Sequence, residues 1–449
     1  MKTLIRSGRL IDPANRVDGR LNLLMKDGRI AWVGCGEPEA DLVVDAQDRI
    51  VAPGFIDIHM HEDPMDMNGR IQFNILNCML RMGATTVLGG NCGINEADPV
   101  EYLNEVDRAG APVNVAMLAG HEYFRVAAGA WDKYAKATPE QRRTMVEGIR
   151  GALEGGCMGV SFGLRYVPGT DEDEFYRAAE CCRAFGGMIA AHVRDDADQV
   201  FAAIDEIARA GQRFGLPVQI SHIGSMGGFG QMEQVLRQTD ALRLNGLDLA
   251  LDCYPYTAFS TRIGATTYDD GWLERYRCDY SALEFCEGPY CGQRATAETF
   301  AEMRRDFPEC ITVCHVMRPE EITRAFRHPA VMVASDGLLD GNQGHPRAAG
   351  TFPRFLAEYA RTGVLDWYSA VEKLTSLPAE RLRLARKGRL NAGADADVVI
   401  FDPAIVRDCA VFDRPTLPPV GIDRVFIGGT EAARNGEILD ARCGRAVRR

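Results

Sequence analysis

Short apolar segments alternate with longer amphipathic segments through most of the chain. Eight of the apolar segments are rich in Ala, Val, Ile or Leu, which is typical of strands that are buried on both faces of a parallel sheet. Helical-looking stretches such as DQVFAAIDEIARAGQRFG separate them. This alternation predicts an α/β fold, a (β/α)8 TIM-like barrel. The predicted barrel strands are residues 55–61, 84–90, 113–118, 159–163, 187–192, 217–222, 248–254 and 331–336.

The pattern changes at both ends of the chain and once in its middle. Residues 1–53 and 391–449 consist of short alternating segments, which are typical of antiparallel strands. Neither fragment alone could bury a core, so we expect both to combine into one small β-sandwich beside a barrel of residues 54–390. A long polar and aromatic region at about 257–310 predicts an insertion that would cover the site. The apolar run 311–316 would be a ninth strand.

Composition and charge restrict the class of protein. The chain has 449 residues, 46% hydrophobic and 25% charged, as in an ordinary globular enzyme. Its formal charge of -12 argues against nucleic acid or an anionic membrane surface as a partner, because both would repel it. The N-terminus has no apolar signal segment and no stretch approaches a membrane span, so we expect a cytoplasmic protein. The 14 cysteines form no disulfide-like framework, and most should be small buried hydrophobes.

Side chains that can bind metal follow several of the predicted strands. His59 and His61 point to one face of their strand, where two imidazoles can chelate a cation. A solvent-facing pair without metal is an equally good explanation of these two alone. Because active sites of such barrels lie at the carboxyl ends of the strands, several such residues together predict a metal-dependent active site. The other candidates at strand ends are Cys92, His192, His222 and Asp336.

The chain resembles a known family in a series of motifs. In order, these are GFIDIHMH, GGNCG, GLRYVPG, AHVRDD, QISHIG, LDCYPYTA, ASDG and HPRAAGTFPR. They resemble the amidohydrolase superfamily, specifically its cysteine-containing N-acyl-D-amino-acid deacylase (D-aminoacylase) branch, over essentially the whole chain. The cysteine and the YPYTA block separate this branch from hydantoinases and dihydroorotases, which usually bridge their metals with a carbamylated lysine. No lysine stands at the corresponding strand ends here.

The resemblance implies a zinc site. Cys92, His192 and His222 would hold one Zn²⁺ tightly, and His59 and His61 would form a second, weaker site that shares the Cys92 sulfur. A thiolate with imidazoles suits zinc better than magnesium or calcium. The alternative for Cys92 is a buried thiol beside a glycine turn.

The expected chemistry follows from the zinc. Because zinc lowers the pKa of a bound water to roughly 7, metal-bound hydroxide would be the nucleophile. Asp336 would act as general base and then as general acid toward the leaving nitrogen. Its alternative role is a helix cap, and no other carboxylate is expected to have a comparable placement.

The substrate implied by the resemblance is a small anion, an N-acyl amino acid. Arg347 matches the position that clamps the α-carboxylate, and a guanidinium binds a carboxylate in bidentate fashion. Tyr254 or Tyr256 would add a hydroxyl, and Tyr166 would line the pocket, although each tyrosine is equally well explained by packing.

Two departures from the family pattern concern the substrate pocket. Gly224 stands where the family usually has a lysine, and Ala349 where it has a tyrosine. Arg165 is a candidate for restoring a positive charge. Arg194 is expected to pair with Asp195 or Asp196, whereas the remaining histidines are expected to be structural, with His345 an open case beside Arg347. These histidines are His121, His315, His328 and His345.

The expected function is zinc-dependent hydrolysis of N-acyl-D-amino acids to a free D-amino acid and a carboxylate. The preference for the D-enantiomer comes only from the resemblance. Two alternatives are a hydrolase of cyclic amides or imides, similar to hydantoinase or dihydroorotase, and a catalytically idle metal-binding protein on the same scaffold. The sequence leaves the oligomeric state open.

Overall fold

Eight parallel strands form a barrel in the computed structural model, which describes all 449 residues. The backbone N–H of Asp336 donates to His59 O at 2.8 Å and that of His61 to Gly337 O at 2.9 Å, which joins the first barrel strand to the last. The predicted barrel is therefore confirmed. Its strands are β8 (Phe55–Asp57), β9 (Ala84–Gly89), β10 (Asn114–Met117), β12 (Gly159–Gly163), β13 (Met188–His192), β14 (Val218–Ile220), β15 (Leu249–Cys253) and β19 (Val331–Val333), and the short β11 (Ala119–Gly120) follows β10.

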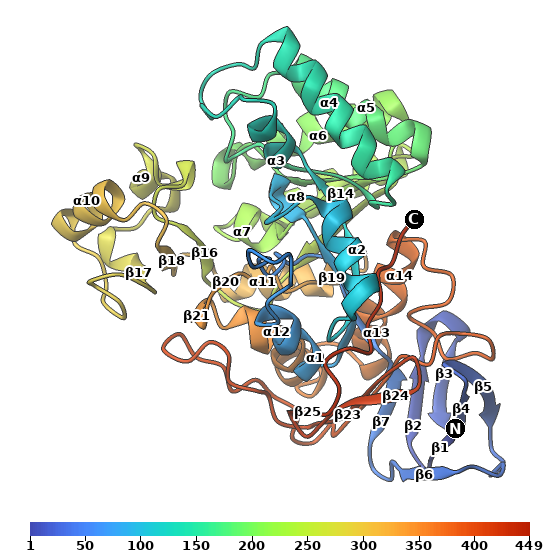
Figure 1. The fold of residues 1–449 in the computed structure, drawn as a ribbon. Coiled ribbons are helices and arrows are strands. Elements are labelled where there is room, and N and C mark those ends of the chain that lie inside the picture. The colour runs from blue at the N-terminus through green and yellow to red at the C-terminus, as the bar shows by residue number, and fades with distance from the viewer.

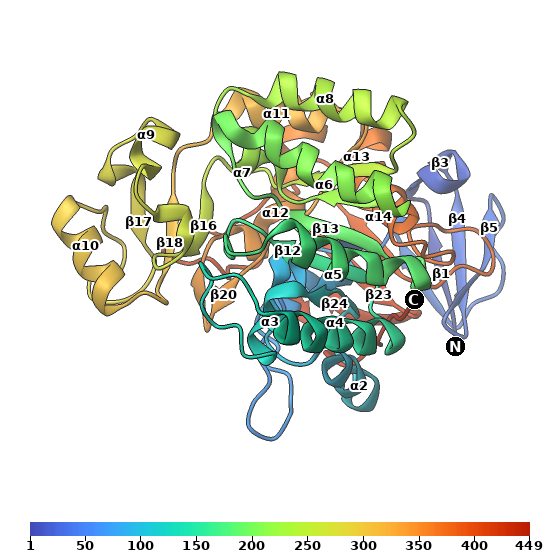
Figure 2. The same ribbon diagram turned by 90° about the horizontal axis from the view of Figure 1, so that it is seen from above.

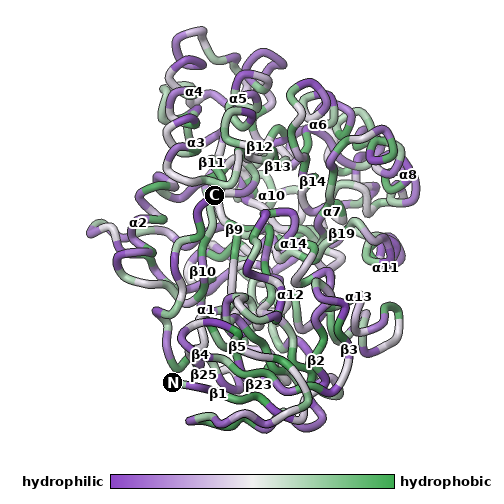
Figure 3. Tube along the Cα trace, turned by 90° about the vertical axis from the view of Figure 1, so that its right-hand side faces the viewer, coloured by the Kyte–Doolittle hydropathy of each residue, from purple (hydrophilic) through white to green (hydrophobic).

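Helices cover the outside of the barrel (Figures 1 and 2). They form because apolar residues recur at helical spacing, as in the helix at 200–214, where Ile204, Ile207 and Gly211 are buried. In Figure 3 the barrel strands are mainly green, whereas the outer helices alternate green with purple. The main helices are α1 (Ile75–Arg81), α2 (Pro99–Ala109), α4 (Pro139–Glu154), α5 (Glu172–Phe185), α6 (Val200–Phe214), α8 (Met232–Leu244), α11 (Pro319–Arg327) and α13 (Trp367–Leu374).

Shorter helices and turns complete the barrel. They are α3 (His121–Ala127), α7 (Ile223–Gly227), α12 (Arg347–Phe355), α14 (Ser376–Arg381) and the hairpin β20 (Leu339–Asp340) and β21 (Gln343–Gly344). Among all the helices, none combines the length and the apolar character that a membrane crossing requires.

Both ends of the chain build a β-sandwich beside the barrel, as predicted. One sheet has the order β5-β4-β1-β6 and the other β25-β24-β23-β22-β7-β2-β3. In the second sheet β7 pairs antiparallel with β22, so that Pro53 lies opposite Val398. The core between the sheets also mixes the two ends, since Ile5 and Val51 share a cluster with Phe426. The strands are β1 (Lys2–Arg6), β2 (Arg9–Asp12), β3 (Val17–Arg20), β4 (Asn22–Lys26), β5 (Arg29–Gly34), β6 (Leu42–Asp45), β7 (Ile50–Pro53), β22 (Val398–Phe401), β23 (Ile422–Ile427), β24 (Thr430–Arg434) and β25 (Glu437–Ile438).

The last residues of the chain leave the sandwich. Gly444 pairs with Ala111, and the backbone N–H of Val447 donates to Val115 O at 2.8 Å, so this segment runs along β10 of the barrel.

A separate antiparallel sheet stands between β15 and α11. It contains β16 (Phe259–Arg262), β17 (Leu283–Phe285) and β18 (Ile311–Cys314), with α9 (Trp272–Tyr276) and α10 (Ala297–Asp306) packed beside it. In Figures 1 and 2 this sheet and its helices lie on the side of the barrel opposite the sandwich. The run 311–316 therefore contributes β18 to this sheet and is not a ninth barrel strand.

Candidate metal centre and active site

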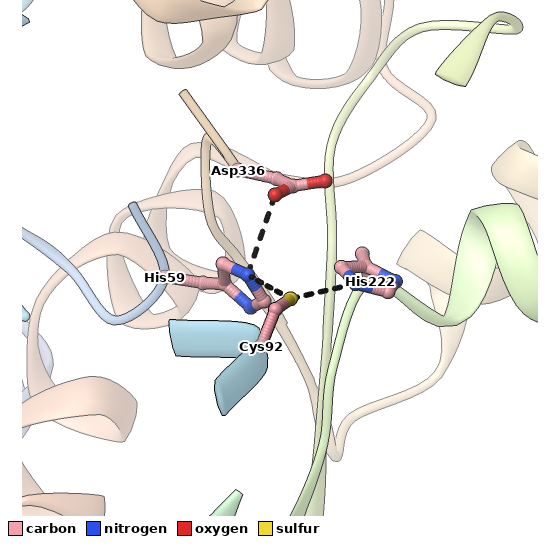
Figure 4. A group of neighbouring side chains, drawn as sticks. All are labelled: His59, Cys92, His222 and Asp336. Carbon is pink, nitrogen blue, oxygen red and sulfur yellow. Dashed lines mark hydrogen bonds and ion pairs between the residues drawn. The ribbon is translucent and has the colours of Figure 1, made fainter. Parts of the chain in front are cut away.

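Four polar side chains from distant parts of the chain meet at the end of the barrel (Figure 4). The Cys92 sulfur lies 3.4 Å from Nε2 of His59 and 3.4 Å from Nε2 of His222. Oδ1 of Asp336 lies 3.3 Å from the same His59 nitrogen. All four residues are buried, and one ligand atom of each lies within 4.8 Å of the others. The residues come from the segments after β8, β9, β14 and β19, so the predicted convergence of strand ends is present in the fold.

His61 and His192 lie beside this group. Nε2 of His61 is 3.2 Å from Oδ1 of Asp336, and the His192 ring centroid is 4.5 Å from that of His222. His192 also helps to lower the pKa of the Cys92 thiol. Because β8 ends at Asp57, both His59 and His61 lie past the strand instead of within the predicted segment 55–61. They nevertheless face the same carboxylate.

Three of these residues have an unusual backbone conformation. Cys92, His222 and Asp336 have φ values of 55°, 34° and 49°, in the left-handed region. For residues other than glycine this conformation costs on the order of 1–3 kcal/mol, and it gathers at functional sites. It turns the chain sharply where the strand ends, so the side chain is directed across the barrel end. The rest of the fold must stabilise these turns.

The loop that carries Cys92 is held by glycines and by Glu62. Gly90 has a φ of 73°, and a Cβ there would lie 2.2 Å from the backbone oxygen of Leu118. The Glu62 carboxylate is buried and accepts from the Gly90 N–H at 2.7 Å and from Nδ2 of Asn95 at 3.0 Å. The sequence analysis missed Glu62, although it directly follows His61.

We expect Gly90→Ala to destabilise the protein more than Gly215→Ala does, and to reduce its metal content. Gly215 also has a left-handed backbone, with a φ of 66°, but a Cβ there meets nothing within 4 Å. Gly215→Ala should therefore lose only about 1 kcal/mol of unfolding free energy. Gly90→Ala adds a backbone clash, and we expect a loss of several kcal/mol. Urea unfolding and metal analysis of both variants measure this, and equal losses would contradict the role given to Gly90.

The electrostatics of the cluster distinguish Cys92 from the other buried thiols. Burial raises the pKa of Cys157 and that of Cys182 to about 12. Burial alone would raise the pKa of Cys92 too, but the adjacent His59 and His222 rings hold it well below its usual value. Burial would likewise raise the pKa of Asp336, yet Arg347 and the histidines hold it well below the usual range. Cys92 is thus prepared to be a thiolate, which is the form that binds metal.

Other buried groups orient the histidines. Oδ1 of Asp252 lies 3.4 Å from Nδ1 of His59 and accepts from the backbone N–H of His222 at 2.7 Å. The Ser225 hydroxyl donates to the His222 carbonyl oxygen at 2.9 Å and lies 3.0 Å from Nδ1 of His222. Nδ1 can therefore donate to Ser225, which leaves the Nε2 lone pair free for a metal. Asp252 lies within β15 and contacts Nδ1 of His59, whereas Asp336 lies against Nε2 of the same ring.

The residues present fit a zinc ion. Tetrahedral zinc, about 2.3 Å from sulfur and about 2.0 Å from nitrogen, would separate the two ligand atoms by about 3.5 Å. The two observed separations from the Cys92 sulfur are 3.4 Å. A thiolate with imidazoles is also a donor set that favours zinc over magnesium or calcium.

Arg347 lies beside the cluster. Its Nη1 is 2.9 Å from Oδ2 of Asp336, and its guanidinium lies over the Tyr254 ring at 4.7 Å. The Tyr254 hydroxyl is buried without a hydrogen-bond partner. The Tyr166 ring lies 4.5 Å from the His192 ring. A cavity of about 650 Å³ opens outward from His61, Asp336, Tyr166 and Arg347, which is enough space for a small organic substrate.

The structure separates the other predicted substrate contacts from the cavity. The Tyr256 hydroxyl turns to Asp408, at 3.3 Å, and Tyr256 does not line the cavity. Arg165 forms an ion pair with Asp195 at 2.8 Å, which neutralises the positive charge proposed for the pocket. Arg194 pairs with Glu206 at 2.7 Å and not with Asp195 or Asp196, which corrects that prediction.

The remaining histidines have local partners. The carboxylates of Glu174, Glu284 and Asp240 lie within 3.1 Å of His121, His315 and His328, respectively. For His345, Nε2 lies 3.1 Å from Ala258 O, and Nδ1 accepts from the Arg347 backbone N–H at 3.0 Å. His345 therefore supports the turn into α12 and does not face the metal cluster.

Comparison with known proteins identifies the family. A model of the amidohydrolase family matches residues 42–166 and 160–433. The chain belongs to the amidohydrolase family. This amidohydrolase is 34% identical to N-acyl-D-glutamate deacylase from Alcaligenes xylosoxydans xylosoxydans, over 95% of the chain and 92% of the relative. It is 32% identical to D-aminoacylase from the same organism, over 99% of the chain and 97% of that relative. The predicted deacylase branch is therefore confirmed.

Solved structures agree with this assignment. A crystal structure of N-acyl-D-glutamate deacylase from Bordetella bronchiseptica, with zinc and a phosphonate inhibitor, matches with a TM-score of 0.89 and 31% identity over 100% of this chain and 99% of that one. A crystal structure of D-aminoacylase matches with a TM-score of 0.90 and 27% identity, with the same coverage. L-hydantoinase from Arthrobacter aurescens matches with a TM-score of 0.67 and 18% identity over the same shares of both chains. This likeness shows a common fold alone. The chain is a deacylase-like, metal-dependent amidohydrolase that acts on C–N bonds.

Proposed function

We propose that this amidohydrolase uses zinc to hydrolyse the amide bond of N-acyl-D-amino acids, giving a D-amino acid and a carboxylate. The observation that carries the proposal is the buried Cys92 sulfur at 3.4 Å from both His59 and His222, with the Asp336 carboxylate beside them. The full-length relatives support the class of substrate and the D-enantiomer.

Five residues would hold the metal. Cys92, His192 and His222 would form the tighter site, and His59 and His61 would form a weaker one on the same sulfur. When bound, zinc lowers the pKa of a water ligand and polarises an amide carbonyl. The low pKa of the Cys92 thiol keeps the sulfur anionic, and Asp252 and Ser225 hold the imidazole rings in place.

Asp336 and Arg347 act on the substrate. Asp336 is buried and anionic, so it can accept a proton from the attacking water and deliver it to the leaving nitrogen. Arg347 presents a planar fork that suits the α-carboxylate, and the substrate would replace Asp336 as its partner. The unpartnered Tyr254 hydroxyl would donate to the same carboxylate, and Tyr166 would form the wall beside His192.

A turnover screen with metal analysis of the same sample tests the proposal. The panel holds N-acetyl-D-amino acids, their L-enantiomers and cyclic amides such as hydantoins and dihydroorotate. We expect zinc in the purified protein and turnover of the D-substrates at least about 100-fold above the L-substrates. Preferred opening of cyclic amides would replace the proposal with a hydantoinase-like activity, and a zinc-loaded protein that hydrolyses nothing in the panel would make it a binding protein.

A further inference from the structure

A second, smaller cavity adjoins the metal centre. It has a volume of about 20 Å³, which is room for about one water-sized group. His192, His222 and Asp336 form one wall, and Ser260 belongs both to this cavity and to the larger one. The small cavity therefore adjoins the site where the amide bond would be held, and the tip of a bound substrate could reach it.

Asp196 gives the small cavity its chemical character. It is 3% exposed, and its Oδ2 accepts from the Tyr276 hydroxyl at 2.6 Å. Its Oδ1 is buried without a hydrogen-bond partner. The nearest cation, Nη1 of Arg275, lies 3.6 Å from Oδ1 and does not line the cavity. A buried acceptor of this kind is satisfied when a ligand brings a donor to it.

The acidic side chains that line the small cavity are Asp196 and Asp336. Neither lysine nor arginine lines it, and its other carboxylate, Asp336, is already paired with Arg347. Burial raises the pKa of Asp196 to about 6, against the effect of Arg165 and the Tyr276 hydrogen bond, so this carboxylate is mostly ionised at pH 7.5. A second carboxylate in the same space would meet a like charge and could not donate to the unpartnered Oδ1 of Asp196, which is unfavourable in a buried site.

Arg347 places the substrate relative to this cavity. Its Nη2 lies 3.5 Å from the backbone oxygen of Ser260, which lines the small cavity. A substrate with its α-carboxylate on Arg347 and its amide at the metal cluster would have its Cα near Ser260, so that its side chain could reach the small cavity. The cavity of about 650 Å³ would remain for the acyl group.

We propose that Asp196 determines the side-chain specificity of this enzyme, so that a short side chain ending in a hydrogen-bond donor, an amide or a hydroxyl, is accepted and a carboxylate is rejected. The proposal rests on the proposed function. Under this proposal the side-chain preference of this chain differs from the substrates in the names of two relatives, N-acyl-D-glutamate deacylase and N-acyl-D-aspartate deacylase. The chain is 34% identical to the first and 30% identical to the second.

Two substrates of nearly equal shape test it. N-acetyl-D-asparagine and N-acetyl-D-aspartate differ in the charge and the donor at the tip of the side chain. We expect the zinc-loaded wild type to favour asparagine by about 100-fold in kcat/KM, because a buried acceptor rejects a ligand that cannot donate to it. Equal kcat/KM values, or a preference for aspartate, would overturn the proposal without any variant.

The variant Asp196→Asn assigns the effect to one residue. Its side chain keeps an acceptor for Tyr276, so we expect the variant to fold. We expect it to gain activity on N-acetyl-D-aspartate, and the ratio of kcat/KM for the asparagine substrate to that for the aspartate substrate to fall at least about tenfold. The matched control is Asp198→Asn, which removes a charge of the same kind two residues away; Asp198 is 67% exposed and outside the cavity. A ratio that is unchanged in Asp196→Asn, or that falls equally in Asp198→Asn, would overturn the assignment.

A binding measurement separates this proposal from the proposed function. If no N-acetyl-D-amino acid is hydrolysed by zinc-loaded protein, the proposed function fails by itself. Calorimetry with free D-asparagine and D-aspartate then still compares the two side chains in the wild type and in Asp196→Asn. Tighter binding of D-asparagine that is lost in the variant supports the role of Asp196, and equal binding of the two overturns it.

Discussion

Replacing Cys92 by alanine should remove both zinc and activity. The sulfur lies between the histidines of both predicted metal sites, so its loss takes a ligand from each of them. We expect the zinc content to fall below about one tenth of the wild-type value. We expect kcat/KM to fall at least about 1000-fold, because water without the metal is a weak nucleophile at neutral pH. Elemental analysis and turnover of N-acetyl-D-amino acids on one sample measure both.

Cys157→Ala and Cys182→Ala are the matched controls. Both thiols are buried as fully as Cys92, but burial raises the pKa of each to about 12, and neither adjoins the metal cluster. They should retain zinc and turnover. Full zinc content in Cys92→Ala would show that the histidines alone hold the metal, and the shared-sulfur arrangement would then be wrong.

The barrel was predictable because its signals are local. Each buried strand lies in a short, mainly apolar run, and the helices between them show one apolar face, so the periodicity changes at each boundary. The run 311–316 has the same local signal, yet it forms β18 outside the barrel. Strand partners depend on contacts that are distant in sequence, and periodicity alone does not contain them.

The cluster was predictable from residue type and position together. Cys92, His222 and Asp336 follow buried strands, and the barrel geometry brings such positions to one end. Their positive φ angles were not predictable, since left-handed turns are usually assigned to glycine. Glu62 and Asp252 were missed because their effect is to hold neighbouring segments in position, which leaves no motif of their own.

The roles of the pocket residues depended on side-chain directions that a sequence does not contain. Tyr254 and Tyr256 are two residues apart, but one hydroxyl is free near Arg347 and the other bonds to Asp408, which is far away in the sequence. Arg165 was assigned to the pocket by its position next to Tyr166, yet Asp195 pairs with it. The charges that a substrate can meet therefore depend on which side chains remain unpaired after folding.

The two carboxylates closest to the histidines should behave in opposite ways when each is changed to asparagine. In Asp336→Asn the side chain keeps its shape and loses the ability to accept a proton. We expect kcat to fall by about 100- to 10,000-fold, with zinc retained by Cys92, His192 and His222. In Asp252→Asn the bonds that orient His59 and His222 weaken, so we expect zinc affinity to fall about 10- to 100-fold, with much of the turnover restored by added zinc.

A zinc titration followed by kinetics at saturating metal distinguishes the two variants. If Asp336→Asn loses zinc and recovers turnover when zinc is added, Asp336 is a ligand and not the proton carrier.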